Sequence, residues 1–139
     1  MKPSRRQAVL WLPAVTAASL VAAAKETLPT KVSRFKDLPV HASGQNRFRP
    51  IVEGFLHDGH PVEAHATELA PSNMPHGSHR HKHEELFLIR EGAVEVTVNG
   101  KAVRLGPGGV AFITSNDEHG IKNVGDTNAH YFVIALGSD

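Results

Sequence analysis

The chain has 139 residues, of which 40% are hydrophobic, so it can bury one core but is too short for two. It contains no cysteine, which excludes disulfides and thiolate ligands and leaves histidine and carboxylate as the strong metal ligands. Three of its 15 basic residues fall within residues 1–24, so the remainder carries 12 basic against 14 acidic residues, a net charge of about −2. No basic stripe remains, and nucleic-acid binding therefore lacks its electrostatic basis.

Residues 1–24 have the layout of a secretory signal. Three cations precede a mostly apolar run over residues 8–24, which ends in small residues suited to cleavage before Lys25. The Arg5–Arg6 pair resembles a twin-arginine signal, although Ala8 stands where a bulky apolar residue is usual. The run is short, rich in alanine and interrupted by a proline, which disfavours a spanning helix. We expect a cleavable signal and an exported protein, periplasmic or secreted, with no stable membrane anchoring after cleavage.

Residues 25–47 lack the regular spacing of apolar residues that predicts a helix or a strand. Pro29, Pro39 and Gly44 are typical of a linker, which can lead to a short N-terminal arm over residues 32–40. We expect the folded domain proper to span residues 48–139.

Short strands with tight turns dominate residues 48–139, and no helical pattern occurs there. Asn99–Gly100 is a strong signal for a two-residue hairpin, and the strand before it alternates valines with polar residues. We expect the strands on either side of Gly92 to pair with each other. The pattern predicts an all-β, double-sheet jelly roll. The expected strands are residues 49–56, 62–69, 84–90, 93–98, 101–105, 110–114, 119–124 and 129–136.

Metal-type ligands gather at the start of the third of these strands. We expect His79, His81 and Glu85 to lie in one strand. Successive side chains of an extended chain alternate faces, so these three share one face and can converge on one point. Glu84 competes for the carboxylate role, but its parity differs and a surface charge is the simpler interpretation. Imidazole with carboxylate suits a first-row divalent ion with open coordination positions.

A second segment has a related layout. Residues 108–123 read as a short apolar strand, a polar turn and a strand that opens with His119. Asn123, near the end of that strand, is interpreted as a structural residue.

At these two segments the chain resembles the cupin superfamily. The first cupin motif, H-x-H-x(3,4)-E-x6-G, is matched by His79, His81, Glu85 and Gly92, and the second, G-x5-P-x-G-x2-H-x3-N, by Gly108, His119 and Asn123. Thr114 replaces the usual proline and Asn116 the usual glycine, but Asn tolerates the left-handed backbone that such a turn needs.

The resemblance implies a cupin double-stranded β-helix, that is, a jelly-roll barrel, over about residues 48–136. It also implies a divalent transition metal on four ligands, His79, His81, Glu85 and His119. Manganese or iron is favoured because a twin-arginine route moves folded proteins, which would trap the ion before export; zinc, nickel or copper are alternatives. Cupin arms often pack on a neighbouring subunit, so a homodimer is expected by resemblance.

Such a site suggests a metal-dependent enzyme acting on a small oxygen-rich substrate, of the dioxygenase, decarboxylase, isomerase or lyase type. The catalytic base is open among His83, Glu84 and His65. His83 is a fifth ligand, a hydrogen-bond partner of a ligand or a rim residue, with the last two favoured. His65 is of interest because residues 62–69 should lie beside the strand that carries Glu85.

Two alternatives to an enzyme follow from the same residues. One is a non-enzymatic module that binds a small molecule or simply holds the metal, and the other is an interaction scaffold with an empty site. The apolar strand residues are expected in the core or lining the pocket beside the metal. These residues are Phe87, Ile89, Val96, Phe112, Ile121 and Phe132.

Overall fold

A computed structural model describes residues 26–139, so the expected signal over residues 1–24 lies outside the described residues. The described part forms nine strands and one short 3-10 turn, η1 (Phe35–Asp37), which confirms the all-β expectation. The strands are β1 (His41–Ser43), β2 (Asn46–Phe55), β3 (Pro61–Leu69), β4 (Glu84–Glu91), β5 (Val94–Val98), β6 (Lys101–Leu105), β7 (Val110–Ile113), β8 (His119–Asn123) and β9 (Ala129–Leu136).

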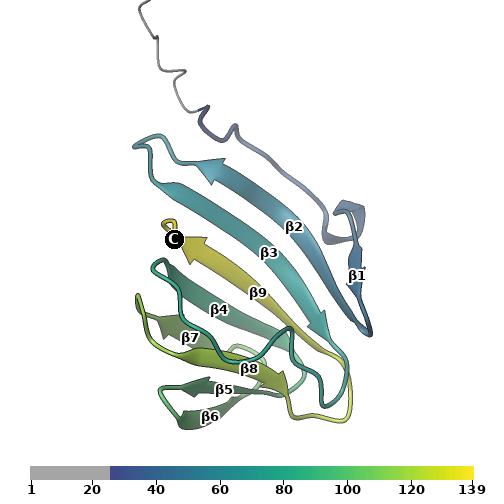
Figure 1. The fold of residues 1–139 in the computed structure, drawn as a ribbon. Helices are drawn as coiled ribbons and strands as arrows, with labels where there is room; N and C mark the ends of the chain where they lie inside the picture. The colour runs from purple at the N-terminus through teal and green to yellow at the C-terminus, as the bar shows by residue number, and fades with distance from the viewer. Residues whose placement is uncertain (1–25) are drawn as a thin grey trace, which may run out of the picture.

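The strands form two antiparallel sheets that face each other across one core (Figure 1). The larger sheet has six strands in the order β1-β2-β3-β9-β4-β7, and the smaller has three in the order β6-β5-β8. The larger sheet begins with β1 inside the segment expected to be a linker or arm, and Leu38 in that segment is already buried.

The expected pairing of the strands on either side of Gly92 is wrong. β4 pairs with β7 and β9, whereas β5 pairs with β6 and β8 in the other sheet. Gly92 carries the chain from one sheet to the other with φ of +81°, and a Cβ there would lie 2.8 Å from Cα of Ala129. Both the left-handed backbone and the close passage over β9 require glycine.

The strand β3 does not lie beside β4, contrary to expectation. β9 runs between them and pairs with both, with Val133 opposite His65 on one side and opposite Phe87 on the other. The hairpin at Asn99–Gly100 forms as expected and joins β5 to β6.

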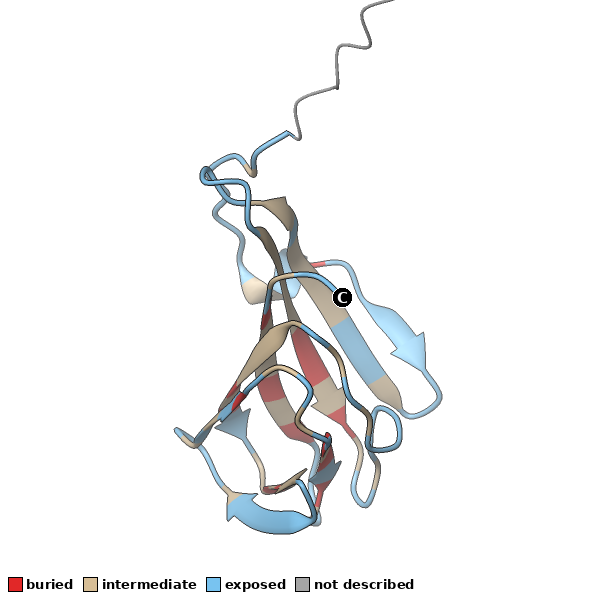
Figure 2. Ribbon diagram, turned by 60° about the vertical axis from the view of Figure 1, so that its left-hand side comes forward, coloured by how far each residue is buried: buried red, intermediate tan, exposed pale blue. Residues whose placement is uncertain are grey.

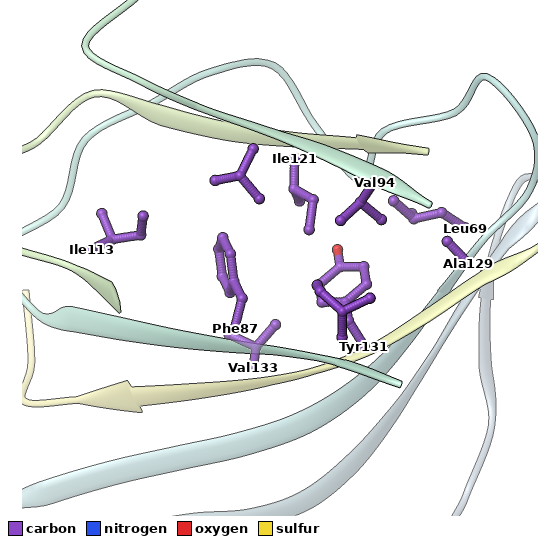
Figure 3. Packing of buried hydrophobic residues seen from close by; sticks show 10 residues of the cluster. Leu69, Phe87, Val94, Ile113, Ile121, Ala129, Tyr131 and Val133 are labelled. Atoms are coloured by element: carbon purple, nitrogen blue, oxygen red, sulfur yellow. The ribbon is translucent and has the colours of Figure 1, made fainter. Parts of the chain in front are cut away.

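The core lies between the two sheets, where alternate residues of the central strands point inward (Figures 2 and 3). Phe87 and Tyr131 pack edge to face with ring centroids 6.0 Å apart. The cluster contains Leu69, Phe87, Ile89, Val94, Val96, Ile113, Ile121, Ala129, Tyr131 and Val133.

Two expected core residues lie elsewhere. Phe112 is 56% exposed, because its neighbours Ala111 and Ile113 take the inward positions of β7. Phe132 likewise points to the outer face of the larger sheet, where it packs in a T-shaped contact with Phe35 of η1.

Candidate metal centre

The four expected ligands come from three different pieces of backbone. Only Glu85 lies within a long strand, and His119 opens β8. His79 lies on an isolated bridge to His119, with each backbone N–H donating to the other residue's carbonyl at 3.0 Å. His81 lies in the irregular segment before β4. The expectation that a single strand presents the first three ligands is therefore wrong, although the structure brings all four side chains to one region.

Three of the ligand atoms lie close together. Nε2 of His81 is 3.1 Å from Nε2 of His119, and Oε2 of Glu85 is 3.4 Å and 3.2 Å from these two nitrogens. Two ligands that bind one ion at about 2.1 Å and at right angles are separated by about 3 Å. The observed separations thus fit three neighbouring positions around one divalent ion.

The hydrogen bonds of the two imidazoles fix which nitrogens carry protons. Nδ1 of His81 donates to the carbonyl of His83 at 2.8 Å, and Nδ1 of His119 donates to the carbonyl of Asp117 at 2.9 Å. A carbonyl oxygen can only accept, so in the neutral rings both Nε2 atoms are unprotonated. Two lone pairs and a carboxylate oxygen then face one another, an arrangement that a cation stabilises.

His79 is the fourth member of the group. One ring nitrogen from each of His79, His81 and His119 lies within 4.8 Å of the others. Nδ1 of His79 is buried and has no hydrogen-bond partner among residues 26–139. Burial lowers the pKa of His79, and the nearby His76 adds to this effect. A neutral ring with an unpaired buried nitrogen fits a metal ligand.

His83 contacts the ligands from outside the group. Its ring stacks on His81 with centroids 3.6 Å apart, and its Nε2 lies 3.6 Å from Oε1 of Glu85. Its Nδ1 donates to Oδ1 of Asp139 at 3.0 Å, and the backbone N–H of Lys82 donates to the same oxygen at 2.9 Å. His83 therefore lies between an acidic side chain and a ligand, as a hydrogen-bond partner would.

Asp139 is a site residue that the sequence analysis missed, because it follows the last strand and belongs to no motif. The hydrogen bonds from Lys82 and His83 hold its pKa below the usual range. Glu84, by contrast, points away from Glu85 by the alternation of β4, and no interaction joins it to the ligands within the described part of the chain.

A cavity of about 70 Å³ adjoins the ligand group. His79, Glu85 and His119 form one part of its wall, and His65 on β3 and Tyr131 on β9 form another. Burial raises the pKa of the Tyr131 phenol well above its usual range, so the phenol stays protonated. The remaining lining is Thr67, Pro75, His76, Phe87, Gly120, Ile121 and Val133.

His65 thus reaches the site although its strand is not adjacent to β4. Its Nδ1 lies 2.7 Å from Oε1 of Glu63, a partner that the sequence analysis did not single out. Alternation along β3 would have placed Glu63 and His65 on one face, which was the available signal. No helix in the described residues is long and apolar enough to cross a membrane.

The two facing sheets and the histidine group at one wall of the core define a small β-barrel with a metal-type site. The chain belongs to the cupin family, since the family model for the cupin domain matches residues 65–135, just over half of the chain.

Known proteins of several kinds are similar to this chain. L-ectoine synthase of Bordetella parapertussis is 33% identical over 63 residues, which cover 45% of this chain and 48% of that protein. The chain spans about half the length of the curated relatives it matches.

Two solved structures have the same fold. An RmlC-like cupin from Shewanella frigidimarina is 18% identical with a TM-score of 0.66, over 79% of this chain and 93% of that one. A predicted oxalate decarboxylase from Thermotoga maritima is 21% identical with a TM-score of 0.64, over 77% and 99% of the two chains. At these identities the likeness concerns the fold alone.

Proposed function

We propose that the protein is a metal-dependent enzyme that acts on a small oxygen-bearing substrate. The supporting observation is the meeting of three acceptor atoms, from His81, His119 and Glu85, beside a small cavity. A simple binding module needs no ionisable side chain in its cavity apart from the ligands, whereas His65 lines this one. The enzyme is therefore favoured over the non-enzymatic alternative.

The four ligands would hold one divalent ion and leave up to about two of six coordination positions for substrate. Bound there, the ion supplies Lewis acidity that draws electrons from a substrate oxygen. Imidazole and carboxylate donors suit manganese or iron, with zinc, nickel and copper as alternatives. The protein's own contribution is to orient the ligands, to surround the substrate with Phe87 and Val133, and to move protons.

Metal analysis tests the proposal. Protein recovered from its native envelope fraction is analysed by elemental mass spectrometry beside His119→Ala and a matched control, His130→Ala. His130 lies on β9 near Glu91 and does not line the cavity. We expect about one ion per chain in the wild type and the control, and loss of the ion in His119→Ala. A metal-free wild type, or a His119→Ala variant that keeps its ion, would overturn the proposal.

We also propose that the protein is exported, periplasmic or secreted, and is not anchored after cleavage. The support is the sequence of residues 1–24, with its cations, apolar run and small residues before Lys25. The intact mass of the same envelope preparation checks this, since cleavage removes those residues.

We further propose that two copies associate through the outer face of the larger sheet. Apolar residues of β7, β4 and β9 stand side by side on that face, and several are exposed. Contiguous exposed apolar surface of this kind is typical of an interface.

A further inference from the structure

Glu63 and His65 form a paired carboxylate and imidazole on the inward face of β3. Oε1 of Glu63 lies 2.7 Å from Nδ1 of His65. The His65 side chain is 22% exposed and that of Glu63 43%, so the pair lies at the mouth of the barrel. The two residues are two positions apart on one strand, and the pairing of β3 with β9 fixes their backbone opposite Ala135 and Val133.

The contact with Glu63 decides which ring nitrogen of His65 can accept a proton. An ionised carboxylate only accepts hydrogen bonds, so Nδ1 of His65 carries the ring proton and donates a hydrogen bond to Glu63. Nε2 is then the nitrogen with a free lone pair, and it has no hydrogen-bond partner among residues 26–139. Phe48 on β2 meets the imidazole edge to face with centroids 5.9 Å apart, and His41 stacks on Phe48 in turn. The ring is thereby held from two sides.

The same cavity joins His65 to the metal-type ligands. His65, Glu85, His79 and His119 all line it, yet no hydrogen bond or ion pair joins His65 to any ligand within the described residues. A small substrate whose oxygen lies beside the ligands would therefore have His65 as a separate neighbour. With a volume of about 70 Å³, the cavity accepts the reacting end of a small molecule.

We infer that His65 is a catalytic acid and base that moves a proton on the substrate, and that Glu63 is its positioning residue. This inference rests on the proposed function. The substrate class is a small carbonyl compound with a C–H bond next to the carbonyl, because an oxygen held beside the ligand group and a separate base nearby suit removal of that proton. A base in this position favours isomerase or lyase chemistry among the four reaction types that the ligand set allows.

The proposed step moves one proton and one electron pair, and both stay within the substrate and His65. The C–H bond breaks, its proton passes to Nε2, and its electron pair moves to the carbonyl oxygen to give an enolate. Glu63 stabilises the imidazolium that forms. Where the carbon that loses the proton also bears a hydroxyl, return of the proton to the former carbonyl carbon completes an isomerisation, with the hydroxyl proton passing to the enolate oxygen as the hydroxyl becomes the new carbonyl. Expulsion of a leaving group on the next carbon instead completes an elimination. No oxidant or reductant is consumed.

Proton exchange tests the inference. Manganese-loaded protein is mixed with 2-oxobutyrate in deuterated water, and loss of the C3 proton signal is followed by NMR. We expect exchange in the wild type, a decrease of about 100-fold or more in His65→Gln, and a smaller decrease in Glu63→Gln. His60→Gln is the matched control, because His60 contacts Asp58 across the same spacing in an exposed turn. The His60→Gln variant should catalyse this exchange at the wild-type rate.

Two further measurements separate this inference from the proposed function. Metal content is determined for each variant, so a wild type without metal contradicts the proposed function itself. Nitrogen-15 NMR at alkaline pH, where imidazole rings are ordinarily neutral, reports the tautomer of His65. We expect an unprotonated Nε2 in the wild type and a mixture of tautomers in Glu63→Gln. Metal-loaded wild type that shows no exchange, or exchange that His65→Gln leaves unchanged, would overturn the inference.

Discussion

Asp139 and His83 lie outside the expected ligand set and contact it in sequence. Asp139 accepts hydrogen bonds from His83 and from the backbone of Lys82, and His83 in turn lies against His81 and Glu85. A partner of this kind fixes the orientation of a ligand before the ion arrives.

Asp139→Ala should therefore weaken metal binding by about 10- to 100-fold, because His83 loses the acceptor that holds its ring beside Glu85. The affinity is measured by competition with a coloured chelator. Asp126→Ala, in an exposed turn between β8 and β9, is the control and should bind as tightly as the wild type. Equal affinity in Asp139→Ala and the control would mean that the contact with His83 does not orient the ligands.

The meeting of the four expected ligands in one region was predictable because their signal is local. The two motifs fix His79, His81, Glu85 and His119 by spacing alone. Asp139 and Glu63 carry no such spacing, and their roles come from how the chain folds around the site.

At the scale of elements, the hairpin between β5 and β6 is tied to the loop that leads to His119. The side chain of Asn99 donates to Oδ1 of Asp117 at 2.8 Å and accepts from the backbone N–H of Glu118 at 3.1 Å. Its own backbone N–H donates to the carbonyl of Glu118 at 2.7 Å. Asn99 also has a φ of +48°, which few residues with a side chain adopt readily.

Replacing Asn99 in two ways should separate these contributions. Asn99→Gly keeps the left-handed backbone but loses the side-chain hydrogen bonds, at a cost of about 1 kcal/mol in the free energy of unfolding. Asn99→Ala also places a less tolerant residue at positive φ, which should add about 1 kcal/mol. Urea denaturation followed by circular dichroism measures both. If the alanine variant is as stable as the glycine variant, the backbone conformation carries no strain at this turn.

Strand positions followed from the sequence better than strand partners did. Alternating apolar residues and turn residues such as Asn99–Gly100 act within a few positions. The observed strands β3 to β9 therefore agree with the expected ones to within one residue, and only β2 starts clearly earlier than expected. Partners depend on where the chain crosses between sheets. The crossing at Gly92 separates β4 from β5, and nothing in the apolar pattern marks it.

The outward position of Phe112 was missed for a related reason. Both faces of β4, β7 and β9 are apolar, so the alternation that distinguishes inside from outside is weak there. Continuous apolar runs are typical of strands buried on both faces, which points to the outer face of the larger sheet as one that a second chain covers.

At the scale of the whole molecule, this outer face forms a contiguous apolar surface. In the register of the sheet, Phe112 stands opposite Leu86, which stands opposite Ile134 on its other side. Val110, Leu88 and Phe132 form a parallel row. Phe112 and Val110 are 56% and 54% exposed. Covering these rows would stabilise an assembly by about 25 cal/mol for each Å² of apolar surface removed from water.

A lysine at Phe112, on the edge strand β7 of this surface, should prevent association, because pairing two copies would bury unpaired charge. We expect the wild type to sediment as a dimer and Phe112→Lys to sediment as a monomer across the same concentration range. Met74→Lys is the matched control, since Met74 is also an exposed apolar residue, at 45%, but lies in the loop between β3 and β4. Circular dichroism of each variant verifies that the barrel stays folded. A wild type that remains monomeric at high concentration, or a Phe112→Lys variant that still dimerises, contradicts an interface on this face. Loss of the dimer in Phe112→Lys but not in Met74→Lys assigns the contact to the outer face of the larger sheet.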